Sequence, residues 1–227
     1  MAKNEQINNK RSREVKPVRG RYTIALLAGA VLLCATAYLV RTYGQEILSL
    51  FVSHERDTKA ELASEREWAQ RLELPGVENM HKVSDFLYRG AQPTKEGMQQ
   101  LKKLGIKTIV SLRSLHSDRD EIGDTGLSYE HIFMKTWHAE DEDVTRFLKI
   151  VTDPNHTPVF VHCQRGADRT GTMCAIYRVA VQNWGKDEAI EEMVKGGFGF
   201  LTRWQNLIDY ISELDIEKIK RSAGFNE

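Results

Sequence analysis

Cys163 and Arg169 stand six positions apart, and their side chains are of the types that attack and bind an anion such as phosphate. A cysteine thiolate is a strong nucleophile, although a free cysteine is mostly protonated at neutral pH. The planar guanidinium group of an arginine can donate two parallel hydrogen bonds to two phosphoryl oxygens. Thr170, the next residue, has a hydroxyl group that can donate a hydrogen bond to the sulfur. These residue types predict nucleophilic chemistry on a phosphate ester.

The residues after the cysteine predict a phosphate-binding loop. They follow the apolar run Pro158–Val161, expected as a buried strand, and precede a helix expected over Thr170–Val181. A tight turn into a helix N-terminus directs backbone N–H groups and a partial positive charge at one point. This field favours the thiolate form of Cys163, and Gly166 permits the backbone geometry. The loop residues are Gln164, Arg165, Gly166, Ala167, Asp168 and Arg169.

Other interpretations of this segment explain fewer of its residues. A buried cysteine is usually a small packing residue, but that role leaves Arg169 and Thr170–Gly171 unexplained. A Walker-type nucleotide loop would end in Gly-Lys-Ser or Gly-Lys-Thr, which this segment lacks. A phosphate-binding module with vestigial hydrolysis stays open as an alternative.

Helical and strand-like segments alternate along the chain up to Cys163. This alternation predicts an α/β fold with a central, mainly parallel or mixed sheet that is flanked by helices, and an all-helical end. Thr94 is expected to cap one helix and Gly105 to end it. The other expected strands are Ile106–Leu112 and Tyr129–Met134, and the other expected helices are Ala189–Val194 and Leu207–Ile219.

Two further stretches, Val83–Pro93 and Leu104–Arg113, join the Cys163 segment in a resemblance to a known family. The chain from about Trp68 to Leu214 resembles the dual-specificity branch of the cysteine-based protein tyrosine phosphatase superfamily. Within that branch it is similar to bacterial exported (periplasmic) dual-specificity phosphatases. The cysteine-to-arginine loop is the most specific part of this resemblance.

The resemblance implies a mechanism and a substrate class. Cys163 would attack phosphorus to form a phosphocysteine, Arg169 would hold the phosphoryl oxygens, and Thr170 would aid release of the thiolate. The implied substrate is protein phosphotyrosine, with phosphoserine and phosphothreonine as further candidates. The implied activity needs no metal and no cofactor.

The charge of the loop bears on the choice of substrate. Only Arg165 adds positive charge between the cysteine and Arg169, and Asp168 removes some, so a polyanionic inositol phosphate is less favoured. The order of residues Gly166–Thr170 is also similar to that of myotubularin-type lipid phosphatases. A phosphoinositide or other phosphorylated small molecule therefore stays open as the substrate. For Asp168, hydrogen bonding to the loop or to a neighbouring arginine is the favoured role.

The resemblance also implies a general acid upstream of the loop, because a departing alkoxide or phenolate must be protonated. An acidic segment lies between an expected strand and an expected helix. We favour Asp141 as the acid, because Asp143 is placed to cap the helix that follows. The candidates are His138, Glu140, Asp141, Glu142 and Asp143.

The start of the chain predicts a membrane segment. Tyr22–Val40 contains 19 residues without a charge, close to the roughly 20 needed to span a bilayer as a helix. The preceding residues 1–21 carry seven basic and two acidic side chains, and Arg41 is the lone basic residue close behind the span. The positive-inside rule then places the tail in the cytoplasm and the enzyme outside the inner membrane. A signal-peptidase site at Ala35–Ala37 is the alternative, which would give a secreted product.

The predicted organisation is one globular domain behind this anchor. It comprises a basic cytoplasmic tail (1–21), a transmembrane helix or signal anchor (22–40), a juxtamembrane spacer (41–67) and a catalytic domain (68–227). The tail carries +5, from seven minus two, and the whole chain is neutral, so the remainder carries −5. This charge argues against nucleic acid as a partner of the catalytic domain. A phosphorylated substrate and the membrane are the expected partners.

Two groups of residues outside the loop are expected to have structural roles without chemistry. Cys174 is expected to pack inside the helix after the loop, although a disulfide with Cys163 stays conceivable. The polar run His116–Glu121 contains metal-ligand types, but it lacks helical ligand spacing. A solvated surface loop is the favoured interpretation of that run.

Overall fold

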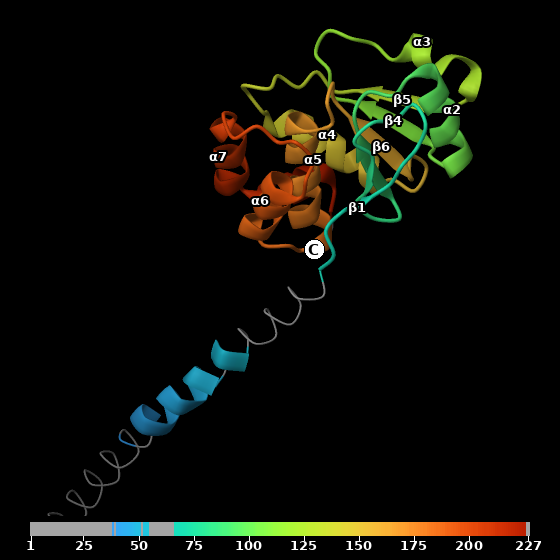
Figure 1. The fold of residues 1–227 in the computed structure, drawn as a ribbon. Coiled ribbons are helices and arrows are strands. Elements are labelled where there is room, and N and C mark those ends of the chain that lie inside the picture. The colour runs from blue at the N-terminus through green and yellow to red at the C-terminus, as the bar shows by residue number, and fades with distance from the viewer. Residues whose placement is uncertain (1–37, 39, 51, 55–65, 226–227) are drawn as a thin grey trace, which may run out of the picture. The chain divides into compact units, whose positions relative to one another are not determined.

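The computed structural model describes residues 38, 40–50, 52–54 and 66–225. The chain divides into two units, Met1–Glu65 and Arg66–Glu227 (Figure 1). The described residues of the first unit are helical. No helix among the described residues is long and apolar enough to cross a membrane. The predicted tail, the predicted cleavage site and the predicted span Tyr22–Val40, apart from Tyr38 and Val40, lie outside the described residues.

The second unit is built on a six-stranded mixed sheet of order β1-β2-β3-β6-β4-β5. The strands β3, β6, β4 and β5 are parallel to one another, whereas β1 and β2 form an antiparallel extension at one edge. The strand that precedes Cys163 is therefore central. The bounds are β1 Gln70–Arg71, β2 His81–Lys82, β3 Leu87–Gly90, β4 Thr108–Ser111, β5 Ser128–His131 and β6 Val159–His162.

Helices cover both faces of this sheet. In Figure 1, α2 and α3 lie on one side of the strands, and α4, α5, α6 and α7 lie on the other. The confirmed architecture is an α/β fold with a flanked mixed sheet. The bounds are α2 Lys95–Leu104, α3 Arg119–Ile122, η1 Gly123–Thr125, α4 Asp141–Thr152, α5 Asp168–Gln182, α6 Lys186–Lys195, α7 Gln205–Glu213 and α8 Ile216–Ala223.

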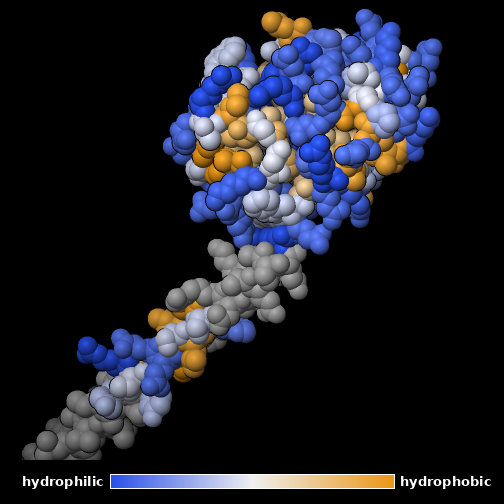
Figure 2. Space-filling view, viewed as in Figure 1, coloured by the Kyte–Doolittle hydropathy of each residue, from blue (hydrophilic) through white to orange (hydrophobic). Residues whose placement is uncertain are grey.

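The period-2 pattern of the strands divides the apolar side chains between two cores. Ile109 and Phe160 join the smaller core, which packs under α2. Their neighbours Val110 and Val161 point the other way, into the larger core under α4 and α5. Burying each such side chain contributes about 1.5–3 kcal/mol. Apolar packing on both faces of the sheet thus holds the central strands in place. The face of this unit seen in Figure 2 is mostly hydrophilic, with small hydrophobic patches.

Helix ends agree with the sequence in one place and differ in two. The Thr94 side chain caps α2 by accepting a hydrogen bond from the Gly97 N–H, and Gly105 ends the helix in the left-handed conformation at φ 97°. The predicted cap at Asp143 is wrong, because α4 begins at Asp141 and Asp143 lies in its first turn. The single helix predicted over Leu207–Ile219 is interrupted, and Asp215 caps a new helix, α8, by accepting from Lys218 N–H.

Candidate active site

Cys163 follows the carboxyl end of β6, which lies between β3 and β4, and the loop after it runs into the first two residues of α5, Asp168 and Arg169. Ligands of open α/β sheets bind at this edge, outside the carboxyl ends of the strands. The first turn of α5 supplies unpaired backbone N–H groups there. The fold thus places the predicted loop Gln164–Arg169 where an anion site is expected.

Gly166 holds the loop against the end of β3. Its φ is +69°, and a Cβ atom at this position would lie 2.2 Å from the carbonyl carbon of Gly90. Any side chain would therefore force the two backbones apart. The Arg89 Nη2 donates to the Gly166 carbonyl oxygen at 2.9 Å, and the Gln92 N–H donates to the Gln164 carbonyl oxygen at 3.3 Å. The stretch Val83–Pro93, noted in the sequence for its resemblance, is the support on which the loop rests.

Cys163 is buried, with 3% of its surface exposed, and it is a free thiol. Burial by itself raises the pKa of this thiol. Hydrogen bonds from the Thr170 side chain and backbone, the charge of Arg169 and the Arg165 N–H outweigh burial and lower the pKa below its ordinary value. The Thr170 hydroxyl is buried and has no hydrogen bond of ordinary geometry with the described residues, which leaves it for the sulfur. The loop therefore favours the nucleophilic thiolate.

Arg169 is fixed at one end of its guanidinium group. Its Nη1 donates to the carbonyl oxygens of Leu112 at 2.9 Å and Met134 at 3.3 Å, which follow β4 and β5. Its Nε and Nη2 make no hydrogen bond with the described residues. Two donors in a fixed plane are thus left for two oxygens of a phosphoryl group.

Asp168 has the structural role expected from the sequence. One carboxylate oxygen accepts from Arg165 Nη2 at 2.6 Å, and the other accepts from the Leu201 N–H at 2.9 Å. The first bond offsets the additional positive charge of the loop. The second ties the loop to the segment between α6 and α7. Ala167, also part of the predicted loop, is buried immediately before α5.

Three residues that support the loop were not recognised from the sequence. Arg89 is 2% exposed beneath the loop, and its guanidinium carbon lies 3.9 Å from the centre of the Phe198 ring. Burial lowers the pKa of Arg89, and Cys174, Glu192 and Cys163 act against that shift. A charged residue inside the otherwise apolar strand Leu87–Gly90 was the available signal. Phe198, which lies between α6 and α7, is thus also a support of the loop.

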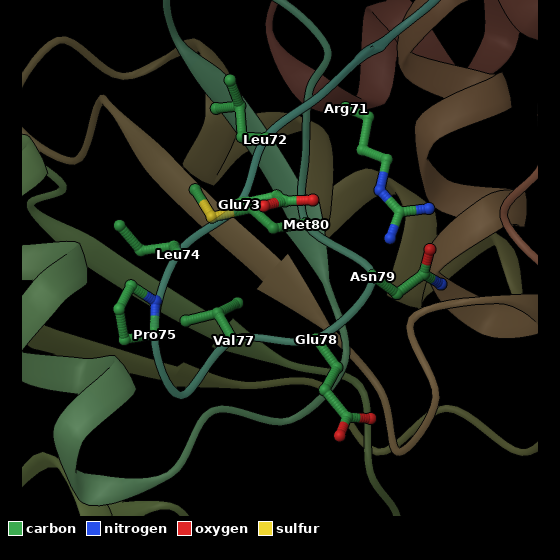
Figure 3. Close-up of a pocket in the computed structure, with 9 residues that line it drawn as sticks. All are labelled: Arg71, Leu72, Glu73, Leu74, Pro75, Val77, Glu78, Asn79 and Met80. Atoms are coloured by element: carbon green, nitrogen blue, oxygen red, sulfur yellow. The ribbon is translucent and has the colours of Figure 1, made fainter.

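Asn79 is the third of these supports, and it borders an open pocket lined by residues 71–75 and 77–80. Its side-chain amide donates to the carbonyl oxygens of Arg165 at 3.0 Å and Phe198 at 2.8 Å. Figure 3 shows the Asn79 amide and the Arg71 guanidinium group on the same side of this pocket. The pocket therefore adjoins the outer side of the phosphate loop.

The structure ties Asp141 to the C-terminal helices. Its carboxylate accepts hydrogen bonds from the Tyr210 hydroxyl at 3.0 Å and from Lys218 Nζ at 2.8 Å. The Lys218 hydrogen bond, opposed by burial and aided by Tyr210, lowers the pKa of Asp141. A lowered pKa keeps the Asp141 carboxyl group ionised, whereas a general acid must carry the proton that it donates. These contacts argue against Asp141 as the general acid, and its role stays a prediction.

Asp143 and His138 lie in different surroundings from Asp141. Burial and the neighbouring Glu140 and Glu142 raise the pKa of Asp143, which is the direction a proton donor needs. His138 is exposed and lies 3.6 Å from Glu140. The acidic segment therefore retains candidates for the acid besides Asp141.

Within the run His116–Glu121, Asp118 departs from the solvated surface that the sequence predicted. Asp118 is fully buried, and one of its carboxylate oxygens lies 2.9 Å from Nε2 of the equally buried His162. His162 is the residue immediately before Cys163. The surface interpretation is wrong for Asp118 because this buried histidine pairs with it.

Comparisons with known proteins agree with this geometry. Residues 67–200, more than half of the chain, match the family model "DSP-PTPase phosphatase fused to NAD+ Kinase". The chain is 32% identical over 171 residues to the dual specificity protein phosphatase TpbA of Pseudomonas aeruginosa, covering 74% of this chain and 77% of that protein. The chain belongs to the dual-specificity phosphatase-like family of cysteine-based protein tyrosine phosphatases, and it is a phosphatase.

Two solved structures show the same relationship. The crystal structure of P. aeruginosa TpbA has a TM-score of 0.63 at 30% identity, covering 70% of this chain and 98% of that chain. The catalytic core of the PP-IP phosphatase SIW14 from S. cerevisiae has a TM-score of 0.58 at 25% identity, covering 66% of this chain and 94% of that chain. The first relative is named a protein phosphatase, and the second is named for an inositol phosphate substrate.

Proposed function

We propose that this chain hydrolyses protein phosphotyrosine through a phosphocysteine intermediate. The observation that carries the proposal is the lowered pKa of Cys163 at the mouth of a loop that ends in the half-anchored Arg169. The Cys163 sulfur forms a bond to phosphorus as the bond to the tyrosine oxygen breaks. Arg169 and the loop N–H groups stabilise the charge on the phosphoryl oxygens. Water then attacks phosphorus, and Thr170 stabilises the departing thiolate.

The charge of the loop supports a monophosphate over a polyphosphate. Asp168 neutralises Arg165, so the loop carries one uncompensated basic side chain, Arg169. Exposed apolar side chains follow β4 and β5 at the same edge of the sheet. Leu115, after β4, is 98% exposed, and Phe133 and Trp137, after β5, are 62% and 67% exposed. Such side chains favour an aromatic leaving group next to the loop. A solved structure similar to this chain is described as TpbA in complex with pTyr.

The runner-up substrate is an inositol diphosphate or phosphoinositide. The observation that favours it is the family relationship with inositol diphosphatases, of which SIW14 of S. cerevisiae is 25% identical over 158 residues. This match spans 66% of this chain and 55% of SIW14. Phosphoserine and phosphothreonine proteins are further candidates.

A competition between substrates tests the proposal. The full chain, purified in detergent without added metal, is assayed on para-nitrophenyl phosphate, a phosphotyrosine peptide and a diphosphoinositol phosphate. We expect kcat/KM to be highest for the phosphotyrosine peptide and to vanish in Cys163→Ser. A higher kcat/KM for the diphosphoinositol phosphate would replace phosphotyrosine as the proposed substrate and leave the proposed cysteine chemistry unchanged. Binding of vanadate without turnover of any substrate would favour a phosphate-binding module.

We also propose that residues 22–40 anchor the chain in the inner membrane, with the catalytic domain outside the cytoplasm. The support is the uncharged 19-residue stretch behind a tail of charge +5. Secretion after cleavage is the alternative. The test is to label a single cysteine placed at Glu213 with a membrane-impermeant maleimide in intact cells whose outer membrane is permeabilised. In a background where the native cysteines are replaced, labelling and membrane association of the full-length chain are expected. Labelling only after cell lysis would contradict the proposal.

A further inference from the structure

Three side chains that end on one small space lie beside the phosphate loop and take no part in the proposed reaction. His116 and Asp118 lie between β4 and α3, Glu121 lies in α3, and their ligand atoms are all within 4.8 Å of one another. His116 Nε2 is 3.4 Å from an Asp118 oxygen and 3.7 Å from a Glu121 oxygen. The distances from His116 are thus short for groups that do not bond to one another, yet longer than the distance of a strong hydrogen bond.

The two separations from His116 are close to those of ligands around one metal ion. Zinc lies about 2.0–2.1 Å from nitrogen and oxygen ligands in tetrahedral sites, so two of its ligands are about 3.3 Å apart. The observed separations from His116 Nε2, 3.4 and 3.7 Å, are close to this value. One imidazole and two carboxylates are typical donors for zinc, whereas magnesium and calcium prefer oxygen ligands alone.

Asp118 supplies a second, independent observation. Its side chain is fully buried, and its Oδ1, the oxygen that faces His116, has no hydrogen-bond partner among the described residues. The Ser111 hydroxyl lies near this carboxylate, but it too lacks a hydrogen bond of ordinary geometry. The Oε2 of Glu121 is likewise buried and unpartnered. A buried carboxylate oxygen without a hydrogen-bond partner is rare and costly, and a cation between His116 and Asp118 would satisfy Asp118 Oδ1.

The neighbouring groups define how His116 faces this space. Arg113 donates to the oxygen of the Gln92 side chain, which turns the Gln92 amide nitrogen towards His116 Nε2. His116 Nε2 therefore accepts a hydrogen bond from the Gln92 amide with its single lone pair, and an ion binds there by displacing Gln92. Arg119 places its guanidinium group over the Tyr129 ring and not on these carboxylates. The His116 and Glu121 side chains are 31% and 25% exposed, so the space is open to solvent.

We propose that His116, Asp118 and Glu121 bind one divalent transition-metal ion of the zinc type. The site is separate from the phosphate loop but joined to it, because the other oxygen of Asp118 holds His162 at 2.9 Å. Asp118 would then connect the ion to His162, the residue before Cys163, and His162 would be the outer-sphere partner of this ligand. The bound ion takes no step in the hydrolysis proposed above.

Zinc titration calorimetry of the full chain in detergent tests this site. All variants carry Cys163→Ser, because a thiolate could bind zinc by itself. We expect one equivalent of zinc to bind, and His116→Ala and Glu121→Gln each to weaken binding at least tenfold. The matched control is His156→Ala, since His156 is similarly exposed and lies 3.9 Å from Asp153 without a third ligand. Binding in this control should equal that of the parent.

Two results would overturn the site. One is absence of zinc binding by the parent chain, and the other is unchanged binding in both His116→Ala and Glu121→Gln. Circular dichroism shows whether these partly exposed variants fold. Zinc K-edge absorption on the parent gives a readout that needs no variant: nitrogen and oxygen neighbours, including an imidazole, are expected. Sulfur neighbours would place the ion elsewhere and contradict the proposal.

Discussion

Cys163 and Cys174 are two buried free thiols only eleven positions apart, yet the protein places them in opposite chemical states. The loop lowers the pKa of Cys163, whereas burial raises the pKa of Cys174 to about 11. Both thiols belong to the larger apolar core, but Cys163 also faces the Thr170 hydroxyl, backbone N–H groups and a cation, whereas burial dominates at Cys174. Reactivity therefore follows the donors around the sulfur and not its burial.

Replacing each cysteine tests this contrast most strongly. Cys163→Ser should lower kcat on para-nitrophenyl phosphate more than about 10³-fold, because no other group supplies the nucleophile. Cys174→Ala should keep kcat within about threefold, since it alters packing alone. Steady-state kinetics of the two variants provide the comparison. Comparable losses in both would remove the distinction between the two thiols.

Arg169 should be the next most sensitive position. Arg169→Lys keeps the charge but loses the planar pair of donors, so we expect kcat/KM to fall about 10²–10³-fold. The matched control is Arg165→Lys, because Arg165 is half exposed and its side chain bonds to Asp168. That control should change kcat/KM only a few-fold. Equal losses would mean that bidentate geometry at Arg169 is unimportant.

Alkylation as a function of pH compares the two thiols directly. Because the folded pKa of Cys163 is lowered, its thiolate persists below the ordinary range, and its iodoacetamide rate should decline only as pH falls through that lowered pKa. Cys174 should stay unmodified until pH rises towards about 11. Peptide mass spectrometry after timed alkylation of the full chain measures both rates. Faster labelling of Cys174 at pH 7 is the opposite result.

Thr170→Val removes one of the donors that distinguish Cys163. We expect the alkylation profile of Cys163 to move to higher pH and kcat to fall about tenfold. Thr172→Val is the control on the same helix, because the Thr172 hydroxyl bonds the Asp168 carbonyl oxygen at 3.0 Å. It should leave the alkylation profile in place. A profile that is unmoved in Thr170→Val would show that this hydroxyl does not stabilise the thiolate.

The smallest effect is expected at Asp141, where the same contrast recurs among carboxyl groups. Lys218 lowers the pKa of Asp141, whereas burial and acidic neighbours raise that of Asp143. Asp141→Asn should therefore change kcat on an aryl phosphate less than about threefold, because an exposed ion pair contributes little. Asp143→Asn should reduce kcat more. A large loss of kcat in Asp141→Asn alone, together with an altered basic limb of the pH–rate profile, would show that Asp141 is the general acid.

The loop was predictable from the sequence because its chemistry is local. Strand, glycine and arginine follow one another within Val159–Arg169, and backbone geometry alone makes them converge. The mixed sheet was predictable for a similar reason, since alternation of strands and helices leaves few arrangements. The contacts of Asp141 with Tyr210 and Lys218 were not, because they join positions 69 and 77 residues apart.

Long-range pairs also explain the other errors. Asp118 reads as one more polar residue in a polar run until the sheet brings His162 beside it, 44 residues away in sequence. Arg89 supports Gly166 from a strand that is 77 residues distant, and Phe198 reaches the same arginine from beyond α6. Spacing along the chain carries no information about these pairs, which only the packing of the sheet and its helices creates.

The most direct test of the account is to trap the covalent intermediate. The full chain is mixed with para-nitrophenyl phosphate, quenched in acid within the first turnovers, digested and analysed by mass spectrometry. We predict a phosphoryl group on the peptide that contains Cys163, absent in Cys163→Ser and present in Cys174→Ala. Sustained turnover in Cys163→Ser, or a phosphoryl group on any residue other than Cys163, would contradict the central claim that the loop makes Cys163 the nucleophile.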